Sequence, residues 1–553
     1  MRSYVLQAVS APAPSKRHLV RPARTTEVVL FGPASTLSRA LEDALQKQGY
    51  SVCHLIPGRQ TTRQDKTHFK LDTSSQDSVQ ALHALRGAAG DRVRTIIALP
   101  DAPQAKRSTE PREMSTEFDR AKALFLLCKV LGPRLSAAHA DTTPGWLIDV
   151  NSIDGNFGLT RRGEHCQQSA GSFGVTKAFA LENPEVQVRC LDVAPDLSVD
   201  AVLERILAEW GWHEAGAEIG YTSTERFRLE LTAQPVRPGS AGDLALDAES
   251  VVLITGGSSG ITAQIGTELA RRYRPILVLV GRSPLPGDEA DDLHALTDPA
   301  QIKSALIASA RRKGEARPAD IETTFRKILK DREIRANIAA MRDAGATVEY
   351  HALDVRQCDA FGKLIEQVYA THGRIDGVVH GAGIIDDKRI RSKTLASFEA
   401  VYDTKVKSAQ VLARGLHPDS LKFVVFLSSI SARFGNAGQC DYSAANEVLN
   451  KLANSLSGRW PQVQVTAINW GPWDAGMVND SLRAMYAARN IRLIPPASGA
   501  AICLDQLQRG PGSAAEILVT ASLQQLTEQI QRRPPARPAT VPQTIRNAQE
   551  VLR

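Results

Sequence analysis

The chain of 553 residues runs twice through the same order of predicted elements. Runs of Val, Ile and Leu that read as strands alternate with helical patterns, first over 26–245 and again over 246–525. Near-continuous apolar strands separated by helices are typical of parallel sheets covered by helices on both faces. The sequence therefore predicts an α/β protein built from two doubly wound units in tandem.

Four regions fall outside this repeat. Residues 1–25 and 526–553 are expected to be linkers, the second because QRRPPARPATVPQTIR is rich in Pro and Arg. QPVRPGSAGDLALDAES is a plausible linker between the halves. A polar stretch at about 286–342 is too long for a strand-to-helix loop, so it predicts added helices. A solvated decoration explains this insertion better than a functional lid.

Composition excludes several classes of protein. Hydrophobic residues make up 43%, which is ample for large cores. The chain has no run of 18 apolar residues and opens without a signal-like segment, so we expect a cytoplasmic protein with no membrane partner. The net charge of +7 is interspersed with acidic groups, and aromatic residues are only 5%, so no nucleic acid is predicted. The seven cysteines lack metal-ligand spacing, and no metal site is predicted.

A glycine-rich turn follows a strand-like run near the start of the second half. Glycine permits a tight turn and lets backbone N–H groups approach a pyrophosphate, which the next helix N-terminus favours electrostatically. One such turn is a weak signal, and its place between a strand and a helix strengthens it. The predicted nucleotide-binding turn consists of Thr255, Gly256, Gly257, Ser258, Ser259, Gly260 and Ile261.

The residues after the second strand predict which nucleotide binds. Arg282 and Ser283 stand where a 2′-phosphate of NADPH would lie, whereas NAD would call for an acidic residue. NADPH is therefore the expected cofactor. Asp354, with Val355 beside it, either accepts the adenine amino group or is an ordinary strand-end carboxylate. Further cofactor contacts are expected at later strand ends and from the catalytic pair, at Gly381, Ala382, Gly383, Gly471, Pro472, Lys405 and Tyr442.

Four residues in the second half predict a catalytic site: Lys405, Ser429, Tyr442 and Asn446. A phenol has a pKa of about 10, and a nearby ammonium group lowers it, so Tyr442 becomes a better proton donor. Ser429 can hydrogen-bond the same substrate oxygen, and Asn446 can hold Lys405 or a water. The alternative is a buried core Tyr with a strand-end Ser, and it predicts no particular spacing.

The first half lacks these residues. Its strand-to-helix turn reads FGPAST. When the halves are aligned, Ser152 falls opposite Ser429, but the position of Tyr442 is taken by His165 or, in another register, by Gln168. The first half is therefore predicted to keep the fold without the chemistry.

On these motifs, residues 250–525 resemble a short-chain dehydrogenase/reductase with a Rossmann-like fold. Most members carry Lys four residues after the Tyr, where this chain has Asn446. The steps of 24 residues from Lys405 to Ser429 and 13 more to Tyr442 resemble ketoreductase domains of polyketide synthases and related fatty-acid synthases. The first half resembles the structural subdomain of those synthases. Thr262 in GGSSGITA departs from the usual last glycine. This turn, together with the insertion, resembles ketoreductases from iterative synthases that make polyunsaturated fatty acids or enediynes, and from some bacterial modular systems.

The resemblance implies a substrate and partners. These would be a 3-ketoacyl thioester on the phosphopantetheine arm of an acyl carrier protein, together with neighbouring synthase domains. Ile385-Asp386-Asp387 stands where related domains carry the Leu-Asp-Asp fingerprint of a D-hydroxyl product. Phe434 replaces the Trp linked to the opposite outcome. The expected activity is NADPH-dependent reduction to a D-configured 3-hydroxyacyl thioester.

Two other functions remain open at this point. A freestanding reductase of small carbonyl compounds would share the catalytic residues. A catalytically silent scaffold that docks carrier protein would not need them. Reduction of a carrier-bound 3-ketoacyl chain would distinguish the synthase domain from the freestanding reductase. NADPH consumption with a 3-ketoacyl thioester would exclude the silent scaffold.

Overall fold

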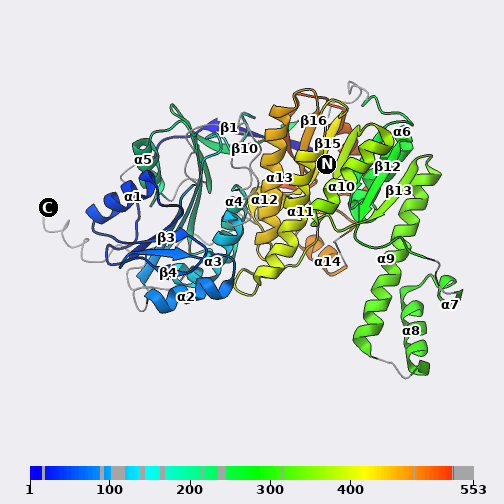
Figure 1. The fold of residues 1–553 in the computed structure, drawn as a ribbon, viewed down its shortest axis with the longest axis horizontal. Coiled ribbons are helices and arrows are strands. Elements are labelled where there is room, and N and C mark those ends of the chain that lie inside the picture. Colours follow the sequence, from blue (N-terminus) through cyan, green and yellow to red (C-terminus); the bar gives the residue numbers. More distant parts are fainter. Residues whose placement is uncertain are drawn as a thin grey trace, which may run out of the picture.

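A computed structural model describes residues 1–527 except 15–18, 87–91, 101–118, 137–142, 162–168, 213–215, 235–243, 288, 290, 314–316, 477, 479 and 526. His165, Gln168, residues 235–243 of the expected linker QPVRPGSAGDLALDAES, and all of 526–553 except residue 527 lie outside the described residues. Figure 1 shows two α/β units lying side by side, the first in blue to teal and the second in green to red. Both predicted units are therefore present.

The first unit forms a sheet in the order β4-β5-β3-β2-β6-β7-β8-β9, in which all neighbours except β4 and β5 are parallel. Its central strand, EVVLF, is wholly buried, as expected for a parallel strand covered on both faces. Its elements are β2 (Glu27–Phe31), α1 (Thr36–Lys47), β3 (Ser51–Pro57), β4 (Thr62–Arg63), β5 (His68–Leu71), α2 (Gln76–Arg86), β6 (Val93–Ala98), α3 (Arg120–Ser136), β7 (Trp146–Asn151), α4 (Gly171–Glu182), β8 (Gln187–Val193), α5 (Val199–Glu209) and β9 (Glu218–Tyr221).

The second unit repeats this order as β13-β12-β11-β14-β15-β16-β17, all parallel. From the central strand β11, the chain adds strands first on one side of the sheet and then on the other. In open α/β sheets such a switch point creates a crevice at the carboxyl ends of the strands. Its elements are β11 (Val251–Thr255), α6 (Gly260–Tyr273), β12 (Ile276–Gly281), α7 (Asp291–His294), α8 (Pro299–Lys313), α9 (Pro318–Asp343), β13 (Thr347–Ala352), α10 (Cys358–His372), β14 (Gly377–His380), α11 (Leu395–Gly415), β15 (Phe423–Ser429), α12 (Ile430–Phe434), α13 (Cys440–Arg459), β16 (Gln464–Trp470), α14 (Asp480–Ala488), α15 (Pro496–Leu507) and β17 (Glu516–Thr520).

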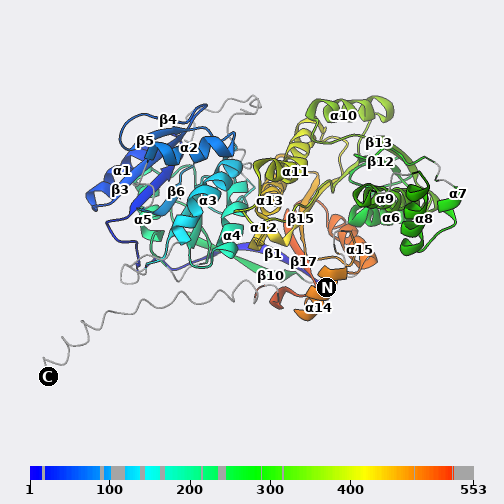
Figure 2. The ribbon, with the colours of Figure 1, turned by 90° about the horizontal axis from the view of Figure 1, so that it is seen from below.

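Two long strands join the sheets. β10 (Arg226–Gln234) pairs antiparallel with β9, and β1 (Arg2–Ser10) pairs antiparallel with both β10 and β17. The two sheets are thus continuous through this ribbon, which Figure 2 shows between the units. The prediction of a linker over 1–25 is wrong for Arg2–Ser10. RSYVLQAVS is rich in strand-favouring residues, and its partners lie more than 200 residues away, beyond the reach of local pattern.

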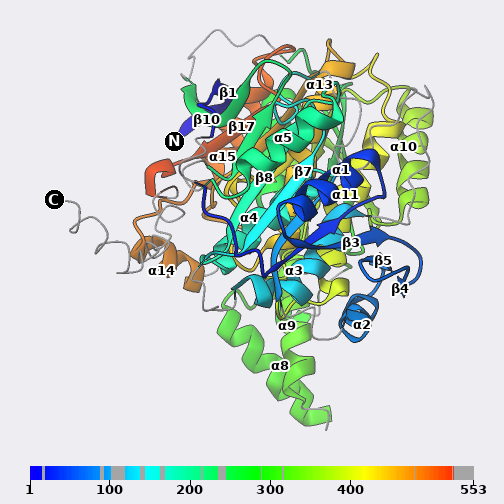
Figure 3. The same ribbon diagram turned by 90° about the vertical axis from the view of Figure 1, so that its left-hand side faces the viewer.

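The insertion is helical, as predicted. α8 and α9 form a hairpin that projects from the unit in Figure 3, joined by the pair Lys303–Glu322 at 2.8 Å. The first half of α9 is largely exposed, whereas Ile334, Ile338 and Met341 near its end are buried against the second core. α9 therefore combines an ordinary crossover helix between β12 and β13 with an outward extension.

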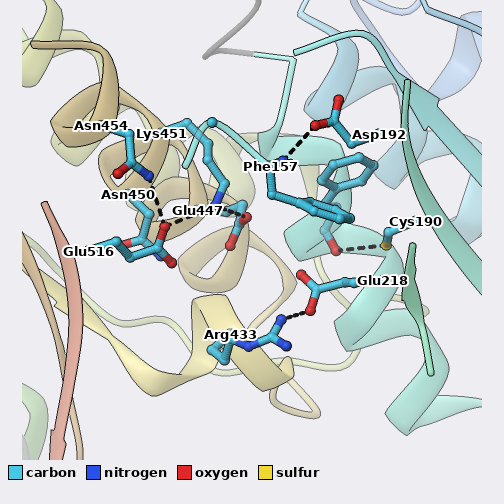
Figure 4. A network of polar contacts seen from close by, with 12 residues as sticks. Phe157, Cys190, Asp192, Glu218, Arg433, Glu447, Asn450, Lys451, Asn454 and Glu516 are labelled. Atoms are coloured by element: carbon cyan, nitrogen blue, oxygen red, sulfur yellow. Dashed lines mark hydrogen bonds and ion pairs between the residues drawn. The ribbon is translucent and has the colours of Figure 1, made fainter. Parts of the chain in front are cut away.

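The units meet along α4 and α13. A Cβ on Gly174 would lie 2.5 Å from the backbone of Ala444, so the two helices approach as closely as a glycine permits. Beside this contact Lys177 lies 2.9 Å from Glu218 and 3.2 Å from Glu447, and Lys451 lies 3.0 Å from Glu516. Figure 4 shows the part of this network around Glu447, Lys451 and Glu516, and it also shows Arg433, which pairs with Glu218. Removing one partner of a buried ion pair leaves an uncompensated charge, so Lys177 of the first unit depends on Glu447 of the second.

Among the described residues, no helix is both long enough and apolar enough to cross a membrane. The six described cysteines are free.

Candidate active site

The predicted site residues converge on one edge of the second sheet. Because β11, β12, β14, β15 and β16 are parallel, their carboxyl ends meet there. The nucleotide turn follows β11, Arg282 follows β12, Gly381 follows β14 and Ser429 ends β15. The order of the strands thus assembles residues that are more than 170 positions apart in sequence.

The turn after β11 has the backbone that its glycines suggest. Gly256 and Gly260 have φ values of +73° and +59°, which only glycine adopts without strain. A Cβ on Gly381 would lie 2.2 Å from Oγ1 of Thr262, so the Thr262 side chain fills space that a larger residue at 381 would need. The threonine at position 262, where related turns have glycine, is therefore accommodated because residue 381 is a glycine. Residues at this turn fit a dinucleotide.

The insertion helix reaches this turn, a contact that sequence reasoning missed. The Gly260 N–H donates to Oε1 of Glu333 at 2.9 Å, and Nδ2 of Asn337 donates to the Ser258 carbonyl at 3.0 Å. A carboxylate at the N-terminus of α6 occupies the kind of position that favours an anion. Only the tertiary fold shows this, because Glu333 lies 73 residues from Gly260.

The expected 2′-phosphate region includes a tyrosine that the sequence did not mark. Tyr350 of β13 donates its hydroxyl to the Ser283 carbonyl at 2.6 Å, and a Cβ on Gly281 would lie 2.6 Å from that hydroxyl. The charge of Arg282 contributes to lowering the pKa of Asp354, although hydrogen bonding from Arg356 is the larger cause. Asp354 is thus paired with Arg356, at 2.6 Å, in this structure.

Lys405 lies on α11 and is 3% exposed. Its Nζ donates to the Leu427 carbonyl on β15 at 2.8 Å, and a Cβ on Gly383 would lie 3.0 Å from its Cε. Burial lowers the pKa of Lys405 to about 7. Its backbone carbonyl contacts His380, whose pKa is lowered to about 3, chiefly by burial and next by Lys405. The side chain of Lys405 therefore leaves little room for a larger residue at position 383.

The structure brings Lys405 and Tyr442 together. Nζ of Lys405 lies 5.7 Å from the centroid of the Tyr442 ring. Asn446, one turn along α13, donates from Nδ2 to the Tyr442 carbonyl at 2.8 Å. Ser429 caps α12, where its Oγ accepts from the Ser431 N–H at 3.2 Å. The adjacent Ser428 contacts the Asn446 carbonyl at 3.3 Å, which links the end of β15 to α13.

The structure does not show the expected lowering of the Tyr442 pKa by Lys405. Burial raises the pKa of Tyr442 to about 12, hydrogen bonding from Asn446 opposes the rise, and the negative charge of Asp387 adds to it. The physical reason is that Tyr442 loses much of its solvent, although the residue is only half-buried by exposed surface, and that the ammonium of the buried Lys405 bonds to a carbonyl instead of the phenol. An anionic ligand beside Lys405 would favour its charged form and reverse this balance.

The two aspartates after β14 have different surroundings. Asp387 accepts from Gln439 at 3.0 Å, and its charge raises the pKa of Tyr442 and of Tyr486 on α14, although burial is the larger cause for both. Asp386 instead pairs with Lys388 at 2.9 Å and accepts from Ser397 at 2.6 Å. Asp387 therefore acts on Tyr442 through its charge, and Asp386 is held toward α11.

A buried ion pair links the segment after β14 to α13. Lys393 is fully buried and lies 2.6 Å from Asp441, next to Tyr442, and it also donates to the Asp386 carbonyl at 2.5 Å. Burial raises the pKa of Asp441 to about 6, against the effect of Lys393. Sequence pattern gave no sign of this pair, since it joins two segments 48 residues apart.

The remaining predicted residues each have contacts of their own. Phe434 ends α12 and lines a cavity of about 430 Å³ with Tyr4, Leu229 and Leu231, between α12 and the joining strands. A Cβ on Gly471 would lie 2.6 Å from Oγ1 of Thr520, and the carbonyl of Pro472 accepts from Ile494 at 2.8 Å. Ala382 donates its N–H to Oγ1 of Thr255 at 3.2 Å, and this bond links the end of β11 to the segment after β14.

Comparison with known proteins gives the class. Residues 250–475 match the family model described as "KR domain". The chain is 30% identical over 426 residues to a polyunsaturated fatty acid synthase of Thraustochytrium sp., a match that covers 73% of this chain and 15% of the relative. It is 27% identical over 329 residues to polyketide synthase PksN of Bacillus subtilis, covering 59% of this chain and 5% of the relative. The chain thus corresponds to a small part of these long relatives.

Solved structures share the whole fold. An N-terminal ketoreductase from the macrolactin assembly line superposes with a TM-score of 0.70 at 18% identity, covering 96% of this chain and 94% of that one. The first ketoreductase of the tylosin polyketide synthase gives 0.63 at 20% identity, covering 100% and 99%. Residues 250–475 of the second unit thus belong to the KR domain family. The chain as a whole is similar to part of a polyunsaturated fatty acid synthase and shares its fold with ketoreductases of polyketide synthases.

Proposed function

We propose that the chain reduces the 3-keto group of an acyl thioester carried on the phosphopantetheine arm of an acyl carrier protein, with NADPH. The observation that carries this proposal is the meeting of Lys405 and Tyr442, 5.7 Å apart from Nζ to ring centroid, at the carboxyl edge that also holds the glycine turn. That arrangement suits proton donation to a carbonyl beside a nicotinamide.

The residues of the chain have separate roles. A bound NADPH would supply the hydride. Tyr442 donates its proton to the carbonyl oxygen, and Ser429 holds that oxygen by a hydrogen bond. Lys405, once charged, stabilises the phenolate that Tyr442 leaves. Asn446 fixes the Tyr442 turn of α13 through its bond to the Tyr442 carbonyl.

The preference for NADPH rests on Arg282. A guanidinium binds a phosphate with two parallel hydrogen bonds, and the NAD ribose would find no acidic partner at this position. Thr255 to Ile261 would hold the pyrophosphate through backbone N–H groups. Glu333 has to leave the Gly260 N–H if that group is to bind a phosphate oxygen.

A D-configured product is the expected outcome, and Asp387 is the residue that supports it. Its carboxylate lies close enough to Tyr442 to act on the phenol electrostatically, whereas Asp386 is paired elsewhere. A residue fixed beside the proton donor can limit the face from which a substrate enters. Neighbouring synthase domains are the expected covalent context, since relatives that match this chain are much longer.

The decisive experiment supplies the purified chain with NADPH and a 3-ketoacyl chain on a carrier protein, then determines product chirality. We expect NADPH consumption and a D-hydroxyl group. Asp387→Asn should erode the stereochemical purity, and Asp386→Asn is the matched control that should keep it. Reduction of small ketones without any reduction of the carrier-bound chain would contradict the proposed substrate. No NADPH consumption with either would contradict catalysis altogether.

A further inference from the structure

A second cluster of chemistry-bearing side chains lies in the first unit, on the sheet face covered by α1. β3 and β5 are parallel neighbours, and their register places His54 directly beside His68. Side chains of paired residues in adjacent strands point to the same face. Glu42 of α1 contacts His68 on that face, with Nε2 of His68 3.1 Å from Oε2 of Glu42. The proposed reductase function does not use these three residues.

The three side chains are arranged to share one ion. One ring nitrogen of each histidine and a carboxylate oxygen of Glu42 lie within 4.8 Å of one another. A zinc ion sits about 2.0–2.1 Å from nitrogen and oxygen ligands, so its ligand atoms lie about 3–3.5 Å apart. The His68–Glu42 pair already has this spacing, and the His54 ring centroid lies 5.7 Å from that of His68.

Each ligand also has a partner that orients it. Nδ1 of His68 lies 3.1 Å from the Asp65 carboxylate, Nε2 of His54 lies 3.1 Å from the Gly32 carbonyl, and Oε1 of Glu42 accepts from Gln46 at 3.1 Å. Metal-bound histidines almost always donate their other ring N–H to a carboxylate or a backbone carbonyl, which fixes the tautomer. Both histidines have such an acceptor.

We propose that Glu42, His54 and His68 bind a divalent zinc ion, with Asp65 as the outer partner of His68. Two imidazoles and a carboxylate are a zinc-binding set that leaves a fourth position for water. Glu42 and His54 are buried, whereas the His68 side chain is 30% exposed, so an ion can enter from the His68 side. Bound zinc would join α1, β3 and β5.

The rival explanation is an ion pair without metal, in which a charged His68 lies between Glu42 and Asp65. That explanation requires no part for His54. The two explanations therefore differ in whether the protein takes up zinc, and in whether His54 and His68 are both needed for uptake.

The test uses the full chain without an affinity tag of histidines. Zinc content after dialysis is measured by mass spectrometry, and affinity by competition with a chromophoric chelator. We expect about one zinc per chain in the wild type, none in His68→Gln, and about 10- to 100-fold weaker binding in Asp65→Asn, the effect typical of losing an outer partner. His417→Gln, which changes an exposed histidine of the second unit, is the matched control and should bind as the wild type does.

Cobalt binding to the wild-type chain provides a second test that does not depend on whether the variants fold. The wild-type chain with Co²⁺ should show the visible absorption of a nitrogen- and oxygen-ligated ion, and zinc should displace it. Absence of zinc and of this absorption in the wild type would overturn the proposal, as would unchanged zinc binding in folded His68→Gln. NADPH consumption serves as an independent readout, because it depends on the second unit.

Discussion

The carboxyl edge of the second sheet holds a glycine turn, a buried lysine and a tyrosine, whereas the same edge of the first sheet is filled by its own side chains. A Cβ on Gly32 would lie 3.0 Å from Leu99, which follows β6. The buried guanidinium of Arg120 donates to the carbonyls of Ala98, Leu99 and Val150 and pairs with Asp149 at 2.7 Å. One strand order thus supports a glycine turn with a buried lysine at this edge of one unit, and an edge filled by a buried ion pair in the other.

The two units also differ in how they treat a buried lysine at their helices. Lys177 on α4 lies between two carboxylates, Glu218 and Glu447, and serves the interface. Lys405 on α11 bonds to the Leu427 carbonyl, and no carboxylate forms an ion pair with it among the described residues. A charge left without a counter-ion in a buried place is costly, and such groups cluster at functional sites. The buried lysine of the first unit is therefore neutralised by its neighbours, whereas that of the second unit has the surroundings expected of the proposed catalytic lysine.

The largest expected effect tests which unit carries the chemistry. Tyr442→Phe should lower NADPH-dependent turnover by about 10²–10⁴, the usual contribution of a general acid, while nucleotide binding persists. Turnover is measured by the loss of NADPH absorbance, and binding by fluorescence titration. Ser429→Ala should also be impaired, whereas Ser152→Ala, its counterpart in the first unit, should match the wild type. Equal losses from the two serine variants would break the comparison.

The next effect concerns the nucleotide. Arg282→Ala should weaken NADPH binding about tenfold to a hundredfold, because a hydrogen-bonded charge is lost, and should leave NADH binding nearly unchanged. Both affinities are measured by titration of intrinsic fluorescence. Equal weakening of NADPH and NADH would show that Arg282 does not meet the 2′-phosphate.

A change in the first unit should lower the turnover of the second unit, because the two share an interface. Gly174→Ala places a Cβ 2.5 Å from the Ala444 backbone, two residues from Tyr442, so the helices have to separate. We expect a loss of about 1–3 kcal/mol in the free energy of unfolding, together with reduced turnover. Gly216→Ala is the control, since a Cβ there meets no described atom within 4 Å. Full stability and turnover in Gly174→Ala would show that the units act separately.

The unpaired lysine predicts a pH dependence of stability. The pKa of Lys405 is about 7 in the folded protein against an ordinary value of 10.5, so between these values the unfolded chain binds an extra proton. The free energy of unfolding should therefore rise with pH, by at most about 1.4 kcal/mol per pH unit for this group. Denaturant titrations without nucleotide at pH 7, 8 and 9 measure the slope. Lys405→Met should flatten it, and Lys407→Met on the same helix should not.

The smallest effect concerns the insertion. Glu333→Gln removes a carboxylate from the N-terminus of α6, where it competes with a phosphate, and should tighten NADPH binding by about 0.3–1 kcal/mol. Glu322→Gln changes an exposed carboxylate of the same helix that pairs with Lys303, and it serves as the control in the same titration. Weaker binding in Glu333→Gln would mean that this carboxylate supports the nucleotide instead of opposing it.

Local pattern was enough to place the strands, the glycine turn, the helical insertion and the unequal halves, because buried parallel strands and tight turns leave periodic and compositional marks. It was also enough to mark Lys405, Ser429, Tyr442 and Asn446, whose spacing along the chain is regular in this kind of site. What the pattern misjudged was Arg2–Ser10, whose strand depends on partners at the far end of both units.

The sequence by itself determined the fold class and the repeat of two units, and it predicted the catalytic groups, since these follow from short-range periodicity and spacing. Only the tertiary structure decided the order of the strands in each sheet and which side chains meet. It placed Glu333 on the Gly260 N–H and Lys393 on Asp441, and it let the charge of Asp387 act on Tyr442. It also set the burial that moves the Lys405 and Tyr442 pKa values in unexpected directions. Contacts between distant segments and their desolvation are properties of the packed chain, and they leave no mark in local sequence.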